Sequence, residues 1–78
     1  MNRLKFLGLK LTKLREAEFK TQQEIADMLC IKRATYAAYE EGRADPPTLI
    51  SIKLCSYYKI SILDLGDIKC LDRQISIY

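Results

Sequence analysis

Leucines repeat at helical spacing in the first part of the chain. Leu7, Leu11 and Leu14 are four and three residues apart, and lysines lie between them. This pattern predicts an amphipathic helix with one apolar face. Because glycine disfavours a helix by about 1 kcal/mol relative to alanine, we expect this helix to begin near Leu7 or Gly8 and to end near Glu18. Residues 1–6 are left open between a strand, a longer helix and an interface.

A second and a third helix are predicted on either side of a tight turn. The sequence Thr-Gln-Gln-Glu at residues 21–24 is a capping box, so a helix follows it and runs through Leu29. The next helix extends from about Arg33 to Glu41, and Gly42 is suited to end it. Two short helices joined in this way form a helix-turn-helix.

The apolar positions support this pair of helices. Residues expected on their inner faces and in the turn are Ile25, Leu29, Ile31, Tyr36 and Tyr39. The residues that share the opposite face of the third helix are Arg33, Ala34, Ala37, Ala38 and Glu41. We therefore expect the tyrosines to pack in the core and the second set to face outwards.

Two more helices are predicted after a turn that contains two prolines. The proline pair at residues 46–47 precedes a helix over residues 48–58, because proline is accepted at a helix start but not inside it. A second capping box at residues 61–64 opens a short fifth helix, which Gly66 ends. The fold class is therefore all-α.

The two ends of the chain hold more apolar residues than such a core requires. They are Leu4, Phe6, Leu9, Ile75 and Ile77. One interpretation is that residues 2–6 and 74–78 pair as short strands, since residues 74–78 alternate polar and apolar side chains. The other, which we favour, is that these residues form a homodimer interface.

Composition and charge restrict the class of protein. The chain has 78 residues, enough for one small domain, and 49 % of them are hydrophobic. Residues 1–43 carry nine basic and six acidic side chains, whereas residues 44–78 carry four of each. This asymmetry suits a polyanion on one side of the domain. No apolar run is long enough for a membrane span and no signal peptide is recognisable, so we expect a soluble, cytoplasmic protein.

The sequence lacks the usual catalytic motifs, and any metal site would have to use thiolates and carboxylates alone. There is no histidine to act as a base, no glycine-rich phosphate loop and no nucleophile elbow, so we do not expect an enzyme. Cys30, Cys55 and Cys70 are widely spaced and are expected to be free, mostly buried thiols rather than zinc ligands. No metal, cofactor or small-molecule ligand is predicted.

Several motifs together resemble a known family. They are Leu11-x-x-Leu14-Arg15-Glu16, Thr21-Gln22-x-Glu24-Ile25-Ala26 and Tyr39-Glu40-x-Gly42-Arg43, followed by Pro46. In this combination and spacing they resemble the Xre-type helix-turn-helix of phage repressor and Cro proteins. The resemblance covers residues 7–66, with the helix-turn-helix at about 21–42, an N-terminal extension at 1–6, and a C-terminal extension at 67–78 that could be a dimerisation strand.

The resemblance implies a five-helix domain that binds double-stranded DNA as a homodimeric transcriptional regulator, most simply a repressor. Positions that match the DNA-contacting residues of the family are Thr21, Gln22, Lys32, Arg33, Ala34, Ala37, Ala38 and Arg43. Thr21 and Gln22 match the helix start that contacts phosphate in the family. Arg43 matches a residue in the loop that approaches the DNA backbone. Arg15 and Glu40 match a structural ion pair.

The sequence also departs from the family pattern. Cys30 occupies a turn position where glycine is usual, Phe19 precedes the second helix in place of another glycine, and Lys32 replaces a Ser or Thr cap. Glu41 places a carboxylate where phosphate would approach, and Arg33 is the only long side chain on the reading helix able to contact guanine in a bidentate manner. The alternative is therefore a helix-turn-helix fold used as a protein–protein interaction module, with weak or non-specific DNA binding.

Overall fold

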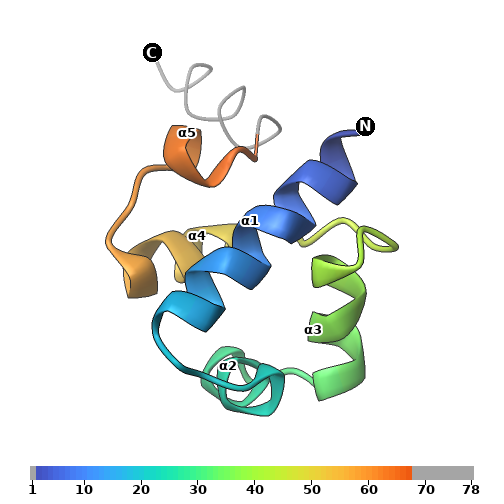
Figure 1. Cartoon of the computed structure of the whole chain (residues 1–78), viewed down its shortest axis with the longest axis vertical. Helices are drawn as coiled ribbons and strands as arrows, with labels where there is room; N and C mark the ends of the chain where they lie inside the picture. Colours follow the sequence, from blue (N-terminus) through green and yellow to red (C-terminus); the bar gives the residue numbers. More distant parts are fainter. Residues whose placement is uncertain (1, 68–78) are drawn as a thin grey trace. The chain divides into compact units, whose positions relative to one another are not determined.

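The computed structural model describes residues 2–67 (Figure 1). Within this part of the chain the helices are α1 (Arg3–Ala17), α2 (Gln22–Leu29), α3 (Arg33–Glu40), α4 (Thr48–Tyr58) and α5 (Ile62–Leu65). The same residues contain no strand, so the all-α prediction is confirmed. The chain divides into two compact units, Met1–Asp45 with α1 to α3 and Pro46–Tyr78 with α4 and α5.

Helix α1 begins four residues earlier than the sequence predicted. The side chain of Asn2 accepts a hydrogen bond from the backbone N–H of Lys5 at 2.9 Å, which is the geometry of an N-cap. Residues 3–6 are helical, so the alternative that residues 2–6 form a strand is wrong. The helix ends at Ala17, close to the predicted end.

Gly8 lies inside α1 because the backbone of α3 passes directly against it. A Cβ atom at Gly8 would overlap the carbonyl oxygen of Glu40 and would lie 2.8 Å from that of Tyr39. Only glycine allows two helices to approach this closely. The prediction that the helix begins near Gly8 was wrong because tertiary packing outweighs the low helix propensity of glycine.

The capping box at the start of α2 is complete. The backbone N–H of Glu24 donates to the Thr21 hydroxyl at 3.1 Å, and the backbone N–H of Thr21 donates to Glu24 Oε1 at 2.8 Å. The hydrogen bond from the Thr21 backbone lowers the pKa of the Glu24 carboxyl. By contrast, Lys32 stands at the N-cap of α3 and its side chain makes no capping hydrogen bond.

The core of the first unit is built from the inner faces of its three helices. The buried side chains are Leu7, Leu11, Ile25, Ala26, Leu29, Tyr36, Ala37 and Tyr39. The rings of Tyr36 and Tyr39 meet edge to face with centroids 6.5 Å apart. The prediction that both tyrosines pack in the core is confirmed, whereas Ile31 in the turn is only half-buried.

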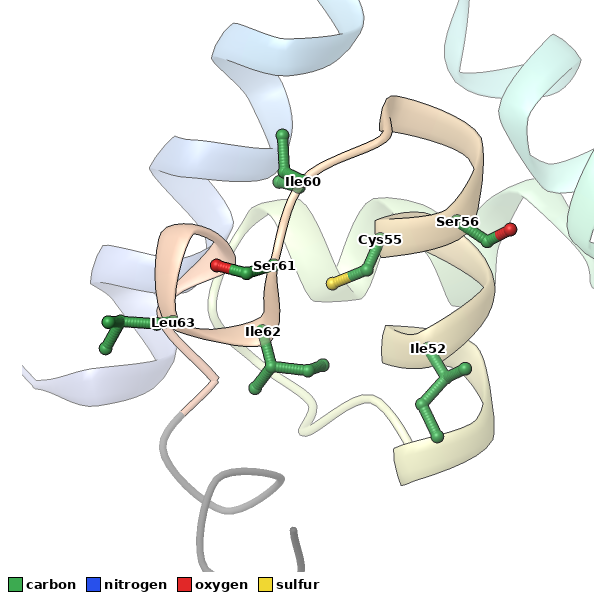
Figure 2. A pocket seen from close by; sticks show the side chains of 7 residues that line it. All are labelled: Ile52, Cys55, Ser56, Ile60, Ser61, Ile62 and Leu63. Carbon is green, nitrogen blue, oxygen red and sulfur yellow. The ribbon is translucent and has the colours of Figure 1, made fainter.

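The second unit consists of α4 and α5. Ile50 and Leu54 are buried, and the Ser61 hydroxyl accepts from the backbone N–H of Asp64 at 3.0 Å to start α5. The fully buried Ser51 hydroxyl donates to the equally buried Asp67 carboxylate at 2.5 Å. An apolar pocket of about 380 Å³ lies on this unit, and Figure 2 shows the side chains that line it.

The turn between α2 and α3 contains a strained residue. Cys30 is exposed and has φ 60° and ψ 41°, the left-handed conformation that favours glycine. The expectation of a mostly buried thiol is therefore wrong for Cys30, although Cys55 is buried. Cys70 and the predicted strand at residues 74–78 lie outside the described residues. Among residues 2–67, no helix has the length and apolar character needed to cross a bilayer.

We expect the substitution Cys30→Gly to stabilise the protein by about 1 kcal/mol. A non-glycine residue in the left-handed region costs roughly 1–2 kcal/mol, and the larger entropy of glycine in the unfolded chain offsets part of this gain. Urea unfolding followed by circular dichroism would measure the change. Cys30→Ala is the matched control, because it removes the thiol but keeps the Cβ, and it should leave stability within about 0.5 kcal/mol.

Candidate nucleic-acid interface

The start of α2 presents donors that suit a phosphate group. The first backbone N–H groups of a helix have no partner within the helix and lie at the positive end of its dipole. Thr21 is exposed, and its hydroxyl oxygen accepts from the backbone N–H of Glu24, while its side chain also hydrogen-bonds the Glu24 carboxylate. A phosphate oxygen would accept from the backbone N–H groups that the start of α2 leaves without a partner in the helix.

The start of α3 carries two exposed cations. Lys32 and Arg33 are both exposed at its first turn, and Ala34 follows them on the surface. Ala38 is half-buried one turn later. Ala37 retains only 7 % of its accessible surface, so the prediction that it faces outwards with the other alanines is wrong. It is buried because α3 turns the side that carries Tyr36 and Ala37 towards the core.

An ion pair connects α1 to the end of α3. Arg15 Nε donates to Glu40 Oε2 at 2.7 Å, and Arg15 Nη2 donates to Glu40 Oε1 at 3.2 Å. Arg15 Nη1 also donates to the carbonyl oxygen of Lys20 at 2.8 Å. Only 14 % of the arginine side chain and 4 % of the glutamate side chain are exposed. This bidentate pair fixes α1, the α1–α2 loop and α3 to one another.

The surroundings of this pair keep both groups charged. Burial alone would raise the pKa of the Glu40 carboxyl, but hydrogen bonds from Arg15, Tyr36 and Gln22, together with the arginine charge, lower it below its usual value. The hydrogen bond to Glu40 in turn raises the pKa of Arg15, against the smaller opposing effect of burial. Glu40 is therefore a carboxylate that only accepts hydrogen bonds.

The side chain of Gln22 extends this network to α3. Gln22 Nε2 donates to Glu40 Oε1 at 3.0 Å, and Gln22 Oε1 accepts from Arg33 Nη1 at 3.3 Å. Sequence analysis placed Gln22 and Arg33 in the site separately and missed the bond between them. Their separation of eleven residues gave no local signal, because the turn between the helices decides which side chains meet.

Arg43 is already engaged by a neighbouring carboxylate. Its Nε donates to Glu41 Oε1 at 2.6 Å, and both side chains are more than half exposed. Glu41 thus neutralises the cation that the sequence analysis assigned to the DNA backbone. Such an exposed pair contributes little stability, about 0–1 kcal/mol.

These features define a helix-turn-helix protein in which two cations stand at the start of α3, the second helix of the motif. This is the geometry of a DNA-binding domain. In the comparison with protein-family models, residues 11–65 match the family HTH_3, described as helix-turn-helix. The match spans more than half of the chain, and the chain belongs to this family of DNA-binding, non-enzymatic domains. Comparisons with curated proteins and with solved structures gave no match.

Proposed function

We propose that the protein is a sequence-specific transcriptional repressor that binds its operator as a homodimer. The observation that carries this proposal is the pair of exposed cations, Lys32 and Arg33, at the first turn of α3 in a helix-turn-helix. In this class of fold the first turn of the second helix of the motif enters the major groove, and the start of the preceding helix contacts phosphate. A repressor of this kind acts by occupying the operator.

Base recognition in this proposal rests on one polar and two apolar side chains. Arg33 is the residue able to contact guanine O6 and N7 in a bidentate manner. Ala34 and Ala38 offer methyl groups, which suit the C5 methyl of thymine. The proposed half-site therefore combines a guanine with neighbouring thymines. Thr21 and Lys32 contact phosphates and supply affinity on any sequence, and Arg43 would add a phosphate contact on release from Glu41.

A salt titration of DNA binding tests the proposal. Fluorescence anisotropy would be measured on the DNA upstream of the protein's own gene and on a shuffled duplex. We expect tighter binding to the upstream DNA and a log–log salt slope of about −0.9 per phosphate contact. Lys32→Ala should reduce that slope by about 0.9, whereas Lys53→Ala, an exposed lysine on α4, should not change it. Equal, weak binding to both duplexes would defeat the proposal.

The homodimer is supported by exposed apolar side chains on α1. Phe6 is 64 % and Leu9 is 49 % exposed, and a monomer gains nothing from large apolar groups in water. Two copies on a palindromic operator would place their reading helices about one helical turn of DNA apart. Analytical ultracentrifugation should give twice the monomer mass. Deletion of residues 74–78 tests whether this segment forms the dimer seam, and an unchanged mass would exclude that role.

A protein-interaction module is the second candidate, and the Glu41–Arg43 pair favours it. That pair removes one of the cations expected to face phosphate. Binding to a protein through apolar and neutral groups would respond weakly to salt. A shallow salt dependence with no preference among DNA sequences, together with a partner recovered by affinity purification, would support this candidate over the repressor.

We expect Glu41→Gln to strengthen DNA binding. The substitution removes a carboxylate near the approaching phosphates and releases Arg43 from a 2.6 Å ion pair. One additional phosphate contact should steepen the log–log salt slope by about 0.9 and raise affinity about three- to tenfold at low salt. Asp27→Gln on α2 is the control, because Asp27 is an exposed carboxylate outside the proposed contacts. If Glu41→Gln leaves the affinity for DNA unchanged, Arg43 does not contact the DNA.

A further inference from the structure

We infer that Phe19 contacts DNA, with its ring packed against a deoxyribose next to the phosphate at the start of α2. The inference rests on the proposed function, because it requires DNA at that helix start. Phe19 lies in the loop between α1 and α2 and is 93 % exposed, the largest fraction among the large apolar side chains of residues 2–67. The ring therefore contributes nothing to the core of the first unit.

The backbone on both sides of Phe19 is held in place. Its N–H donates to the carbonyl oxygen of Glu16 at 3.0 Å, and the N–H of Lys20 donates to that of Arg15 at 3.2 Å. These are the two hydrogen bonds of a Schellman motif at the end of α1. Arg15 Nη1 donates in return to the Lys20 carbonyl oxygen at 2.8 Å, and the same guanidinium is paired with Glu40. The loop therefore presents the ring to solvent from a fixed position.

The backbone conformation of Phe19 costs stability that glycine would not cost. Its φ is 57°, in the left-handed region where the Cβ of a non-glycine residue is crowded. Glycine is the usual residue at this position of a Schellman motif and exposes no apolar ring to water. A single phenylalanine on a surface needs no explanation. One that is held in a strained conformation and adds nothing to the core points to a contact outside the chain.

The place of Phe19 in the sequence identifies that contact. Thr21, the N-cap of α2, follows two residues later, so the two Cα atoms lie within about 7 Å of each other. This distance is comparable to the size of one nucleotide, so a phosphate bound at the start of α2 has its sugar within reach of the ring. The carbon atoms of a deoxyribose are apolar, and packing an aromatic ring on them removes apolar surface from water. Because the loop is fixed before binding, the contact costs little conformational freedom.

A tryptophan at this position reports the contact directly. The chain has no tryptophan, so Phe19→Trp introduces a single indole. Its fluorescence is quenched with acrylamide in the free protein and on the DNA upstream of the protein's own gene. We expect quenching to decrease when DNA is bound. Leu49→Trp on α4, where the side chain is 62 % exposed, is the matched control and should be quenched equally with and without DNA. If Phe19→Trp binds DNA and its quenching does not change, the inference is wrong.

The substitution Phe19→Gly should change stability and DNA affinity in opposite directions. Removal of the left-handed phenylalanine should raise the urea midpoint of unfolding. Loss of the ring should lower affinity about three- to tenfold, with an unchanged salt slope because no charge is removed. Phe19→Tyr keeps an aromatic ring and should recover most of that affinity. Lys59→Gly is the matched control, because Lys59 is exposed at the end of α4 with φ 57°, and it should raise the midpoint without lowering affinity.

Three results would count against the inference, each in a different way. An affinity of Phe19→Gly equal to or above that of the wild type would overturn it. A loss of affinity accompanied by a smaller mass in analytical ultracentrifugation would place Phe19 in the contact between two copies and would overturn it too. If the wild-type protein binds neither the upstream DNA nor the shuffled duplex, the proposed function itself fails, and this inference fails with it.

Discussion

Replacement of Gly8 by alanine is expected to destabilise the protein by about 2 kcal/mol. The added Cβ would overlap the Glu40 carbonyl oxygen and lie 2.8 Å from that of Tyr39. Overpacking of this kind costs about 1–3 kcal/mol, and backbone atoms of α3 yield less readily than a side chain would. Alanine gains about 1 kcal/mol of helix propensity, which offsets only part of a cost at the upper end of that range. Urea unfolding at constant pH would measure the difference.

Lys13→Ala on the same helix is the control for this prediction. Lys13 is exposed, so the change should alter stability by no more than about 0.5 kcal/mol. If Gly8→Ala were as stable as wild type or more stable, helix propensity would outweigh packing at this position. That result would contradict the close approach of the α3 backbone to Gly8 of α1.

Replacement of Glu40 by alanine is expected to cost about 2–3 kcal/mol at neutral pH. The substitution removes the bidentate partner of Arg15, whose side chain is only 14 % exposed, and leaves that guanidinium charge without compensation. It also removes the acceptor of the Gln22 amide. Glu41→Ala, one residue further along, is the matched control, because its carboxylate is exposed and contributes about 0–1 kcal/mol.

The cost of losing Glu40 should depend on pH with a definite sign. The pKa of Glu40 is lower in the folded protein than in the unfolded chain, where it is about 4.3. The carboxylate therefore contributes its full stabilisation above that unfolded value and loses it as pH falls through the lowered folded value. Wild type and Glu40→Ala should converge in stability on acidification. If the difference in stability between wild type and Glu40→Ala stays constant from pH 7 to about pH 2, the ion pair is not the cause of that difference.

The helix starts show what local chemistry can predict. The capping box at Thr21 and the Ser61 cap each depend on residues within one turn of the chain, and both helices begin where those residues indicate. Gly42 likewise follows the end of α3 with φ 75°. These features were predictable because sequence neighbours supply every group involved. The uncapped start of α3 at Lys32 follows from the same reasoning.

The start of α1 was not predictable in this way. Gly8 weakens a helix when its neighbours along the chain are the only consideration, and the stabilising contact comes from the backbone of α3, more than thirty residues later. The burial of Ala37 has a similar origin, because alanine is accepted on both faces of a helix. Composition and spacing carry no information about which of these small residues meets another element.

The sequence by itself determined the helices, the helix-turn-helix at α2 and α3, and the two cations at the start of α3, since each depends on residue types at short spacing. Only the tertiary structure decided how those residues are used. It joined Arg15, Gln22, Arg33 and Glu40 in one hydrogen-bonded network, and it placed Glu41 on Arg43. The network required three helices to bring distant side chains within about 3 Å, and directional hydrogen bonds act only at such distances.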